Sequence, residues 1–254
     1  MGDDRRRFLK VAGVTLLAVG GAPVLTTLAQ DKSSGHGNAT AGAKRFAMVI
    51  DLKRCEQEQG CTLCSEACHR EHNVPDFGNP KDEVKWIWKE TYEHAFPSEE
   101  YSYAPERVAG PMPVMCNHCD HPPCVRVCPT KATWKRDDGI VMMDWHRCIG
   151  CRYCMVACPY SSRSFNWRNP RPFIKQLNAD FPTRTKGVVE KCTMCEERLS
   201  DGLAPACVAA CKAKAMTFGN LADPNSEVRK LLRDGYALRR NPGLGTLPQI
   251  YYLV

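Results

Sequence analysis

The sixteen cysteines of this 254-residue chain form four groups of four, and none remains outside them. In chain order the groups are Cys55, Cys61, Cys64 and Cys68; Cys116, Cys119, Cys124 and Cys128; Cys148, Cys151, Cys154 and Cys158; and Cys192, Cys195, Cys207 and Cys211. The third group has the spacing C-x2-C-x2-C-x3-C followed by proline, a bacterial pattern for binding [4Fe–4S] clusters. Four such groups predict four clusters, and four clusters in one short chain predict electron transfer.

The spacing also predicts which thiolates share a cluster. C-x2-C spacing lets one loop surround three corners of a cubane while backbone N–H groups face its sulfides. The fourth cysteine lies one helical turn further on and, in two-cluster ferredoxins, ligates the neighbouring cluster. Applied here, this crossover predicts four ligand sets: Cys55, Cys61, Cys64 and Cys211; Cys192, Cys195, Cys207 and Cys68; Cys116, Cys119, Cys124 and Cys158; and Cys148, Cys151, Cys154 and Cys128.

Other cysteine chemistries fit the pattern less well. The fourth group resembles a zinc ribbon site, but zinc there would leave the other groups unexplained. Disulfides are the usual alternative in an exported protein, but they do not form where the thiolates already hold iron before export. Covalent c-type haem would need C-x-x-C-H, which the sequence lacks. A catalytic cluster needs an open iron corner, yet the pattern fills every corner with cysteine, so no catalytic residue is expected. Four histidines near the cysteines are interpreted as hydrogen-bond donors or surface residues: His69, His72, His118 and His121.

The N-terminus resembles a twin-arginine export signal. Arg5-Arg6-Arg7-Phe8-Leu9-Lys10 precedes an apolar stretch at 11–28, although Asp4 stands where Ser or Thr is usual. Cleavage is expected after Ala29, with an uncleaved membrane anchor as the alternative. Such signals carry folded proteins, so the thiolates would cross the membrane already bound to iron. The expected location is the extracytoplasmic (periplasmic) face, with attachment to the membrane through partners or through an uncleaved signal.

The charge balance gives no support to a nucleic-acid partner. The formal net charge of +7 counts every cysteine as neutral. A [4Fe–4S]2+ cluster with four thiolates carries about −2 in total, so four clusters bring the chain close to neutrality. The fractions of apolar residues, 43%, and of charged residues, 25%, are those of an ordinary globular protein.

Short apolar segments predict the strands that position the cysteine loops. They lie at 45–52, 132–135, 139–144 and 215–218. The order strand, cysteine loop, short helix, strand is typical of a ferredoxin module, and it occurs here more than once. The second and third cysteine groups lie between the first and the fourth, which indicates that one module is inserted into the other. We therefore expect an α+β fold of duplicated, nested ferredoxin-like modules with two insertions.

The expected domains are an export signal at 1–29, a flexible linker at 30–44 and a four-cluster domain at 45–254. Within that domain we expect an outer module at 45–75 and 190–220, an inner module at 112–160, insertions at 76–111 and 161–189, and a C-terminal extension at 221–254. The aromatic residues of the insertions either cover the clusters or form a docking surface for partner subunits.

The extension predicts one helix and one strand. The helix would be capped by Asp223, begin at Pro224 and end at Gly235, with Val228, Leu231 and Leu232 as its apolar stripe. The strand would follow at 249–253.

These motifs resemble the four-cluster iron–sulfur subunits of membrane oxidoreductases, a family that includes the small subunits of DMSO, polysulfide and formate enzymes. Four segments carry the resemblance: Met48 to Cys55, Cys116 to Cys124, Val189 to Cys195 and Asp223 to Val228. The widened first group, the segment from Cys68 to Pro75 and the separate export signal are similar to the exported DsrO-like subunit of the Dsr membrane complex of sulfur metabolism and to its Hmc-type equivalent.

The resemblance implies a subunit that docks on a quinone-interacting multi-helix membrane protein, often beside a multihaem cytochrome c and further iron–sulfur or haem subunits. The expected function is to relay electrons between that membrane protein and a partner redox subunit on the extracytoplasmic face. Two alternatives stay open: the small subunit of a molybdopterin reductase of the polysulfide or DMSO type, and a catalytic iron–sulfur enzyme. A redox sensor fits less well, since it needs one labile cluster rather than four.

Overall fold

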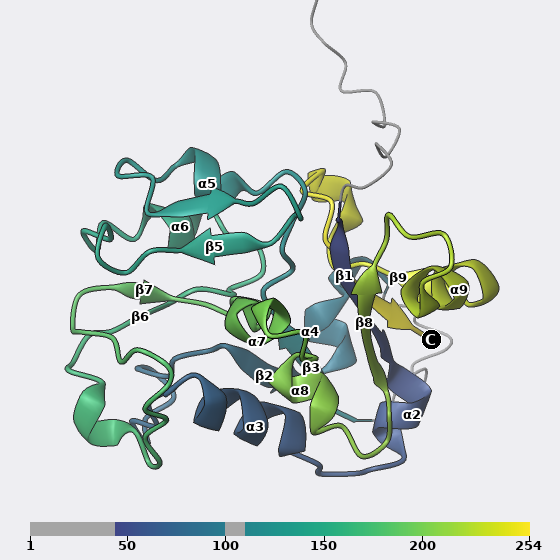
Figure 1. Cartoon of the computed structure of the whole chain (residues 1–254), viewed down its shortest axis with the longest axis horizontal. Coiled ribbons are helices and arrows are strands. Elements are labelled where there is room, and N and C mark those ends of the chain that lie inside the picture. The colour runs from purple at the N-terminus through teal and green to yellow at the C-terminus, as the bar shows by residue number, and fades with distance from the viewer. Residues whose placement is uncertain (1–43, 100–109) are drawn as a thin grey trace, which may run out of the picture. The chain divides into compact units, whose positions relative to one another are not determined.

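The computed structural model describes residues 44–99 and 110–254 (Figure 1). The expected export signal at 1–29 and all but the last residue of the expected linker lie outside the described residues. In the two described ranges, every helix is too short or too polar to cross a lipid bilayer.

The largest sheet has the strand order β8-β1-β10-β9. Its strands are β1 (Phe46–Asp51), β8 (Met216–Asn220), β9 (Ala237–Leu238) and β10 (Ile250–Leu253). β1 is parallel to β10 and antiparallel to β8. Met48 and Ile50 of β1 face the main core, while Ala47 and Val49 face a smaller one. A strand buried on both faces is apolar throughout, which is why this segment was predictable.

Helix α9 (Glu227–Asp234) covers the smaller core (Figure 1). Its Val228 is fully buried against Ala47 and Val49, and Leu231 and Leu232 pack beside it as the apolar stripe predicts. Gly219 of β8 lies directly beneath, where an added Cβ would come within 2.8 Å of the Val228 side chain. The helix is therefore attached closely to the sheet.

The predicted start of this helix is wrong by three residues. Its N-cap is Ser226, whose Oγ accepts a hydrogen bond from the Arg229 N–H at 3.4 Å, rather than Asp223. The Asp223 carboxylate instead accepts from the Asn225 N–H at 2.9 Å and closes a turn before the helix. Both residue types suit either role, so the sequence pattern alone did not separate them. The end at Gly235 is as predicted.

In the described residues, three antiparallel strand pairs complete the sheets. They are β2 (Ile87–Glu90) with β3 (Met112–Met115), β4 (Thr133–Lys135) with β5 (Val141–Met143), and β6 (Ser164–Phe165) with β7 (Val189–Glu190). β1, β3, β5 and β7 each end within five residues of the first cysteine of a group. The strands therefore fix where each cysteine loop begins.

The remaining helices are short. They are α2 (Leu52–Glu56), α3 (Leu63–Glu71), α4 (Tyr92–Ala95), α5 (Pro123–Arg126), α6 (Tyr153–Val156), α7 (Glu196–Ser200) and α8 (Ala206–Ala209), with 3-10 turns at Pro97–Glu99, Arg171–Phe173 and Pro242–Leu244. Isolated helices of one or two turns are unstable in water. Their stability must therefore come from what they pack against.

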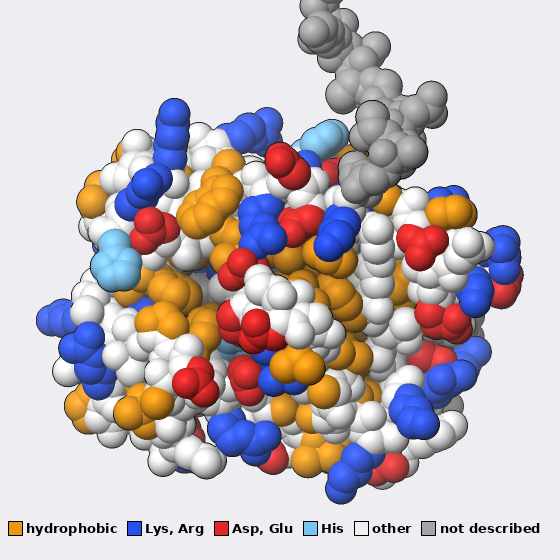
Figure 2. Space-filling model, viewed as in Figure 1, with side chains coloured by type: hydrophobic (Ala, Val, Ile, Leu, Met, Phe, Trp, Pro, Cys, Tyr) orange, Lys and Arg blue, Asp and Glu red, His pale blue; other side chains and the backbone are white. Residues whose placement is uncertain are grey.

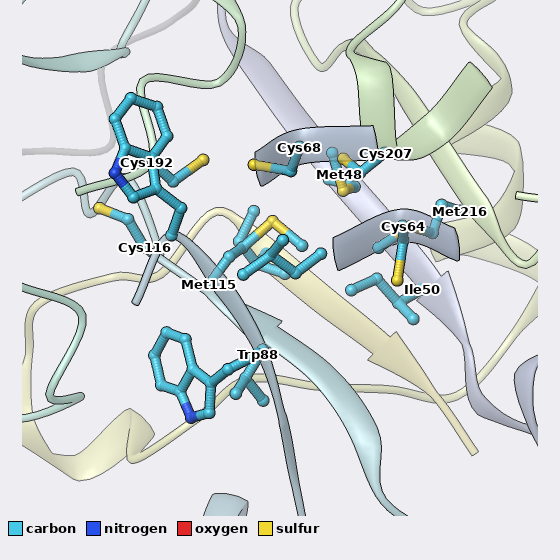
Figure 3. Close-up of a cluster of buried hydrophobic side chains, with 14 of the residues drawn as sticks. Met48, Ile50, Cys64, Cys68, Trp88, Met115, Cys116, Cys192, Cys207 and Met216 are labelled. Atoms are coloured by element: carbon cyan, nitrogen blue, oxygen red, sulfur yellow. The ribbon is translucent and has the colours of Figure 1, made fainter. Parts of the chain in front are cut away.

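The main core contains cysteines among its apolar side chains. Figure 3 shows Cys64, Cys68, Cys116, Cys192 and Cys207 among methionine, isoleucine and tryptophan side chains. Four aromatic side chains of the first insertion are buried in this core: Trp86, Trp88, Tyr92 and Phe96. Trp167 of the second insertion is 46% exposed, so the described aromatics of the two insertions are not all core residues.

Candidate metal centres

All sixteen cysteines lie in the described residues, and none forms a disulfide. The structure brings together the four cysteines of each predicted ligand set. Each set is called a site below. The first site consists of Cys55, Cys61, Cys64 and Cys211, which line one small cavity together with Lys89. Burial raises the pKa of the Cys55 and Cys64 thiols, and the Lys89 ammonium partly opposes this.

The second site is the most deeply buried and consists of Cys68, Cys192, Cys195 and Cys207. Burial raises the pKa of Cys68 well above its ordinary value, and the charges of the other three cysteines raise it further. Two backbone N–H groups donate to these sulfurs: Met194 to Cys192 and Ala206 to Cys195, each at 3.3 Å.

The third site consists of Cys116, Cys119, Cys124 and Cys158. Burial raises the pKa of Cys119 to about 12, and the charges of Cys116, Cys124 and Cys158 contribute. Burial, followed by the charge of Cys116, also raises the pKa of Cys158. The charges of Cys116 and Cys124 act on both Cys119 and Cys158, so the four sulfurs lie close together.

The fourth site consists of Cys128, Cys148, Cys151 and Cys154, which line a second small cavity. Cys151 is the one exposed cysteine of the sixteen. Burial would raise the pKa of Cys128, but hydrogen bonds from Thr130 and from backbone N–H groups outweigh it, and the pKa of Cys128 falls. This site therefore lies nearest to solvent.

Left-handed backbone conformations shape the loops around the sites. Gly150, at φ +70°, lies so close to Gly187 that an added Cβ would be 2.4 Å from the Gly187 carbonyl oxygen. Three non-glycine residues with positive φ, Lys131, Ser161 and Lys214, each stand three residues after the last cysteine of a group. In each case the N–H bonds back to the carbonyl of that cysteine. This repeated turn is not predictable from the sequence, because no common residue type marks it.

The residues around the cysteines suit a bound anionic group with sulfur acceptors. The Nδ1 of buried His118 accepts a hydrogen bond from the Val141 N–H at 3.0 Å, which leaves the proton on Nε2. That Nε2 has no protein partner, and neither do the side chains of Asn117 and Thr193. Burial, followed by three nearby cations, lowers the pKa of His118 far below its ordinary value, so it is a neutral donor. Buried donors without acceptors fit cluster sulfides.

The other three histidines take different roles. His72 is buried, with its Nε2 2.8 Å from Glu197 and its ring stacked on Trp86. His121 is exposed, and its Nδ1 lies 3.3 Å from the Gly245 carbonyl. Burial lowers the pKa of His69.

Residues 110–172 and 176–221 match the family model described as a 4Fe-4S dicluster domain. The chain is also 39% identical to the Hdr-like menaquinol oxidoreductase iron-sulfur subunit 1 of Archaeoglobus fulgidus, over 98% of this chain and 97% of that protein. The chain belongs to the iron–sulfur subunits of membrane oxidoreductases. The predicted family and the predicted [4Fe–4S] cofactors, consistent with four clusters, are thereby confirmed.

Two further relatives of this subunit point the same way. One is a putative iron–sulfur subunit of a dimethyl sulfoxide reductase from Halobacterium salinarum, which is 42% identical over 82% of this chain and 78% of that protein. The other is the menaquinone reductase iron-sulfur cluster-binding subunit of Nitratidesulfovibrio vulgaris, which is 37% identical over 82% of this chain and 88% of that protein. The subunit thus shares its cofactor type with proteins of several electron-transfer complexes.

Proposed function

We propose that the four cysteine sites each hold one [4Fe–4S] cluster and form a single electron path in the order first, second, third, fourth. A bound [4Fe–4S] cluster takes up and releases single electrons. The observation that carries the proposal is that cysteines of different sites stand four residues apart at one short helix. Cys64 of the first site and Cys68 of the second lie on α3, where four residues span about 6 Å.

The same arrangement recurs in the other groups. Cys207 of the second site lies on α8 and Cys211 of the first follows it. α5 links Cys124 of the third site to Cys128 of the fourth, and α6 links Cys154 to Cys158 in the opposite sense. These links connect first to second and third to fourth.

One further interaction, an electrostatic one, connects the two halves. Burial raises the pKa of Cys192 in the second site to about 12, and the next largest cause is the charge of Cys116 in the third. Both side chains lie in the main core (Figure 3). The pairing of β1 with β8 around this arrangement supports the nested duplication: the strand before the first cysteine group pairs with the strand after the last.

The first and fourth sites are the two ends of the proposed path, because the second and third are the most buried. Beside the fourth site, Ile149, Tyr153 and Val156 are 67%, 63% and 88% exposed. Apolar side chains around an exposed cysteine suit the core of an interface with a partner redox subunit. Acidic and basic side chains are interspersed on the face shown in Figure 2, so that face has no extended surface of a single sign.

The complex that we infer is a membrane quinol oxidoreductase. The support is the relative aligned over nearly its whole length, whose name describes a menaquinol oxidoreductase subunit. We propose extracytoplasmic assembly after twin-arginine export, with a quinone-interacting membrane subunit and a cytochrome c partner of the Dsr or Hmc type. A second candidate, the small subunit of a molybdopterin reductase, is favoured by the dimethyl sulfoxide reductase relative.

Anaerobic purification of the native complex tests the proposal. We expect about sixteen irons per chain, magnetically interacting S = 1/2 signals in the EPR spectrum of the reduced protein, and co-purification of a multi-helix membrane protein. A co-purified molybdopterin subunit would select the second candidate. An iron-free chain holding zinc or disulfides would overturn the cluster assignment.

A further inference from the structure

Two of the buried arginines in the described residues, Arg163 and Arg184, differ in their counter-charges. Arg184 is 2% exposed, and its guanidinium lies 2.7 Å from the Glu190 carboxylate. Arg163 is 4% exposed, but no carboxylate of the described residues forms an ion pair with it. Its Nη2 instead lies 3.1 Å from the Cys124 sulfur. A buried guanidinium stays protonated and is costly without a counter-charge, and the Cys124 thiolate is the counter-charge within hydrogen-bond distance of Arg163.

The Arg163 guanidinium lies between two sites. Its Nη2 also donates to the Thr133 hydroxyl at 2.9 Å, and its Nη1 is 3.7 Å from the Met143 sulfur. Because the Thr133 hydroxyl donates its own proton to the Met142 carbonyl, only its lone pairs face the guanidinium. The β4–β5 hairpin therefore holds Arg163 in place from one side.

The positive charge of Arg163 also affects the pKa of Cys154 in the fourth site. Burial raises the pKa of Cys154, while the charge of Arg163 and a hydrogen bond from it are the largest opposing causes. One cation thus acts on Cys124 of the third site and on Cys154 of the fourth.

We propose that the fixed positive charge of Arg163 raises the reduction potentials of the clusters at the third and fourth sites. The inference rests on the proposed cluster at each site. Reduction adds one negative charge, and a buried cation within hydrogen-bond distance stabilises that charge in a medium of low dielectric. Arg163 therefore favours electrons in the half of the path that ends at the exposed Cys151.

Lys191 does not carry the same inference, although it is fully buried beside Cys192. Burial lowers the pKa of the Lys191 ammonium, so burial acts against its charge. A guanidinium keeps its charge in any such environment.

The test is an anaerobic potentiometric titration of the cluster-loaded chain, followed by EPR. The variants are Arg163→Gln, which keeps an N–H donor but loses the charge, and Arg163→Lys, which keeps the charge. The matched control is Arg126→Gln, because Arg126 is an exposed arginine two residues after Cys124. Loss of an exposed charge is screened by water and salt.

We expect Arg163→Gln to lower two of the four midpoint potentials, each by at least a tenfold change in the redox equilibrium, or 59 mV for one electron. The other two potentials should stay in place. Arg163→Lys should lower the same two potentials by less, and Arg126→Gln should leave all four within a twofold change.

Three results would overturn the inference. In the first, Arg163→Gln keeps its iron but shifts no potential. In the second, Arg126→Gln shifts the potentials as much as Arg163→Gln. In the third, both Arg163→Gln and Arg163→Lys lose their iron. Arg163 would then be a structural residue. An Arg163→Lys chain that retains its iron and lowers two potentials supports the inference. Absence of four clusters from the wild-type chain would instead refute the proposed function, a separately visible outcome.

Discussion

At the scale of single residues, the cysteines differ mainly in burial. Cys68 and Cys207 of the second site are almost inaccessible, whereas Cys151 of the fourth is exposed. A buried ligand is surrounded by packed side chains that cannot rearrange, while an exposed one borders water. The same substitution should therefore have unequal effects at the two places.

We expect Cys151→Ala to reduce the iron content by about four irons per chain and to leave the other three clusters intact. Cys68→Ala should lose at least as much iron and should also destabilise the fold, because it leaves a cavity and an incomplete site in the core. Iron analysis and thermal unfolding under anaerobic conditions measure both effects. Equal loss of thermal stability in the two variants would contradict this expectation.

Thiol ionisation gives a second expectation at this scale. Burial raises the pKa of most of these thiols above the ordinary value of 9.0, to about 12 for Cys119 and Cys192. Iron binds the thiolate, so binding releases protons, and raising the pH favours binding until the pH exceeds the pKa. Iron retention by the folded, cluster-loaded chain in the presence of a chelator should therefore keep increasing from about pH 7 to about pH 9. Retention that levels off at neutral pH would mean that the thiols ionise more easily than their burial implies.

At the scale of elements, the loops around the sites depend on a few backbone positions. Gly150 has φ +70° and almost touches the Gly187 carbonyl, whereas Gly202 has φ +74° with open space around it. An alanine at either position meets the unfavourable left-handed conformation, which costs about 1–2 kcal/mol. Only at Gly150 does the added Cβ also force the two loops apart.

Gly150→Ala should therefore lose the cluster of the fourth site, and Gly202→Ala should retain all four. Iron content and the EPR signal count of both chains decide between these outcomes. If Gly150→Ala kept its full iron, the close approach of the two loops would not be needed for the fourth site.

The sequence predicted best those elements whose pattern is local. β1, β4, β5, β8 and β10 were predicted from short local runs of strand-favouring residues, although β4 is mostly exposed. The partners in β2–β3 and β6–β7 lie more than twenty residues apart in the sequence, and no local pattern pairs them. The four sets of cysteines that the structure brings together were predictable from spacing together with the ferredoxin crossover, whereas Arg163 was not. It stands in an insertion among other arginines, and only its contacts distinguish it.

At the scale of the whole molecule, the cysteine sites occupy places that a larger core would otherwise fill. Five cysteines of the first three sites are part of the main core, and most helices around them have only four or five residues. Such helices have little stability of their own. The folded state should therefore depend on the bound metal.

We expect anaerobic removal of iron by a chelator to unfold much of 44–254, because metal-binding free energy contributes directly to folding. Far-ultraviolet circular dichroism should show loss of helix in step with iron release, and exposed apolar surface should bind a hydrophobic dye. An iron-free chain with unchanged circular dichroism and a sharp thermal transition would show that the protein scaffold folds on its own.

The exposure of Cys151 sets an order in which the subunit deteriorates in air. Dioxygen diffusing from bulk solvent meets the fourth site first, while Trp86 and its neighbours shield the interior. A subunit without its partners would thus lose the cluster of the fourth site first and the buried clusters later. A partner protein bound over Ile149 and Val156 would shield the fourth site from dioxygen as well as exchange electrons with it.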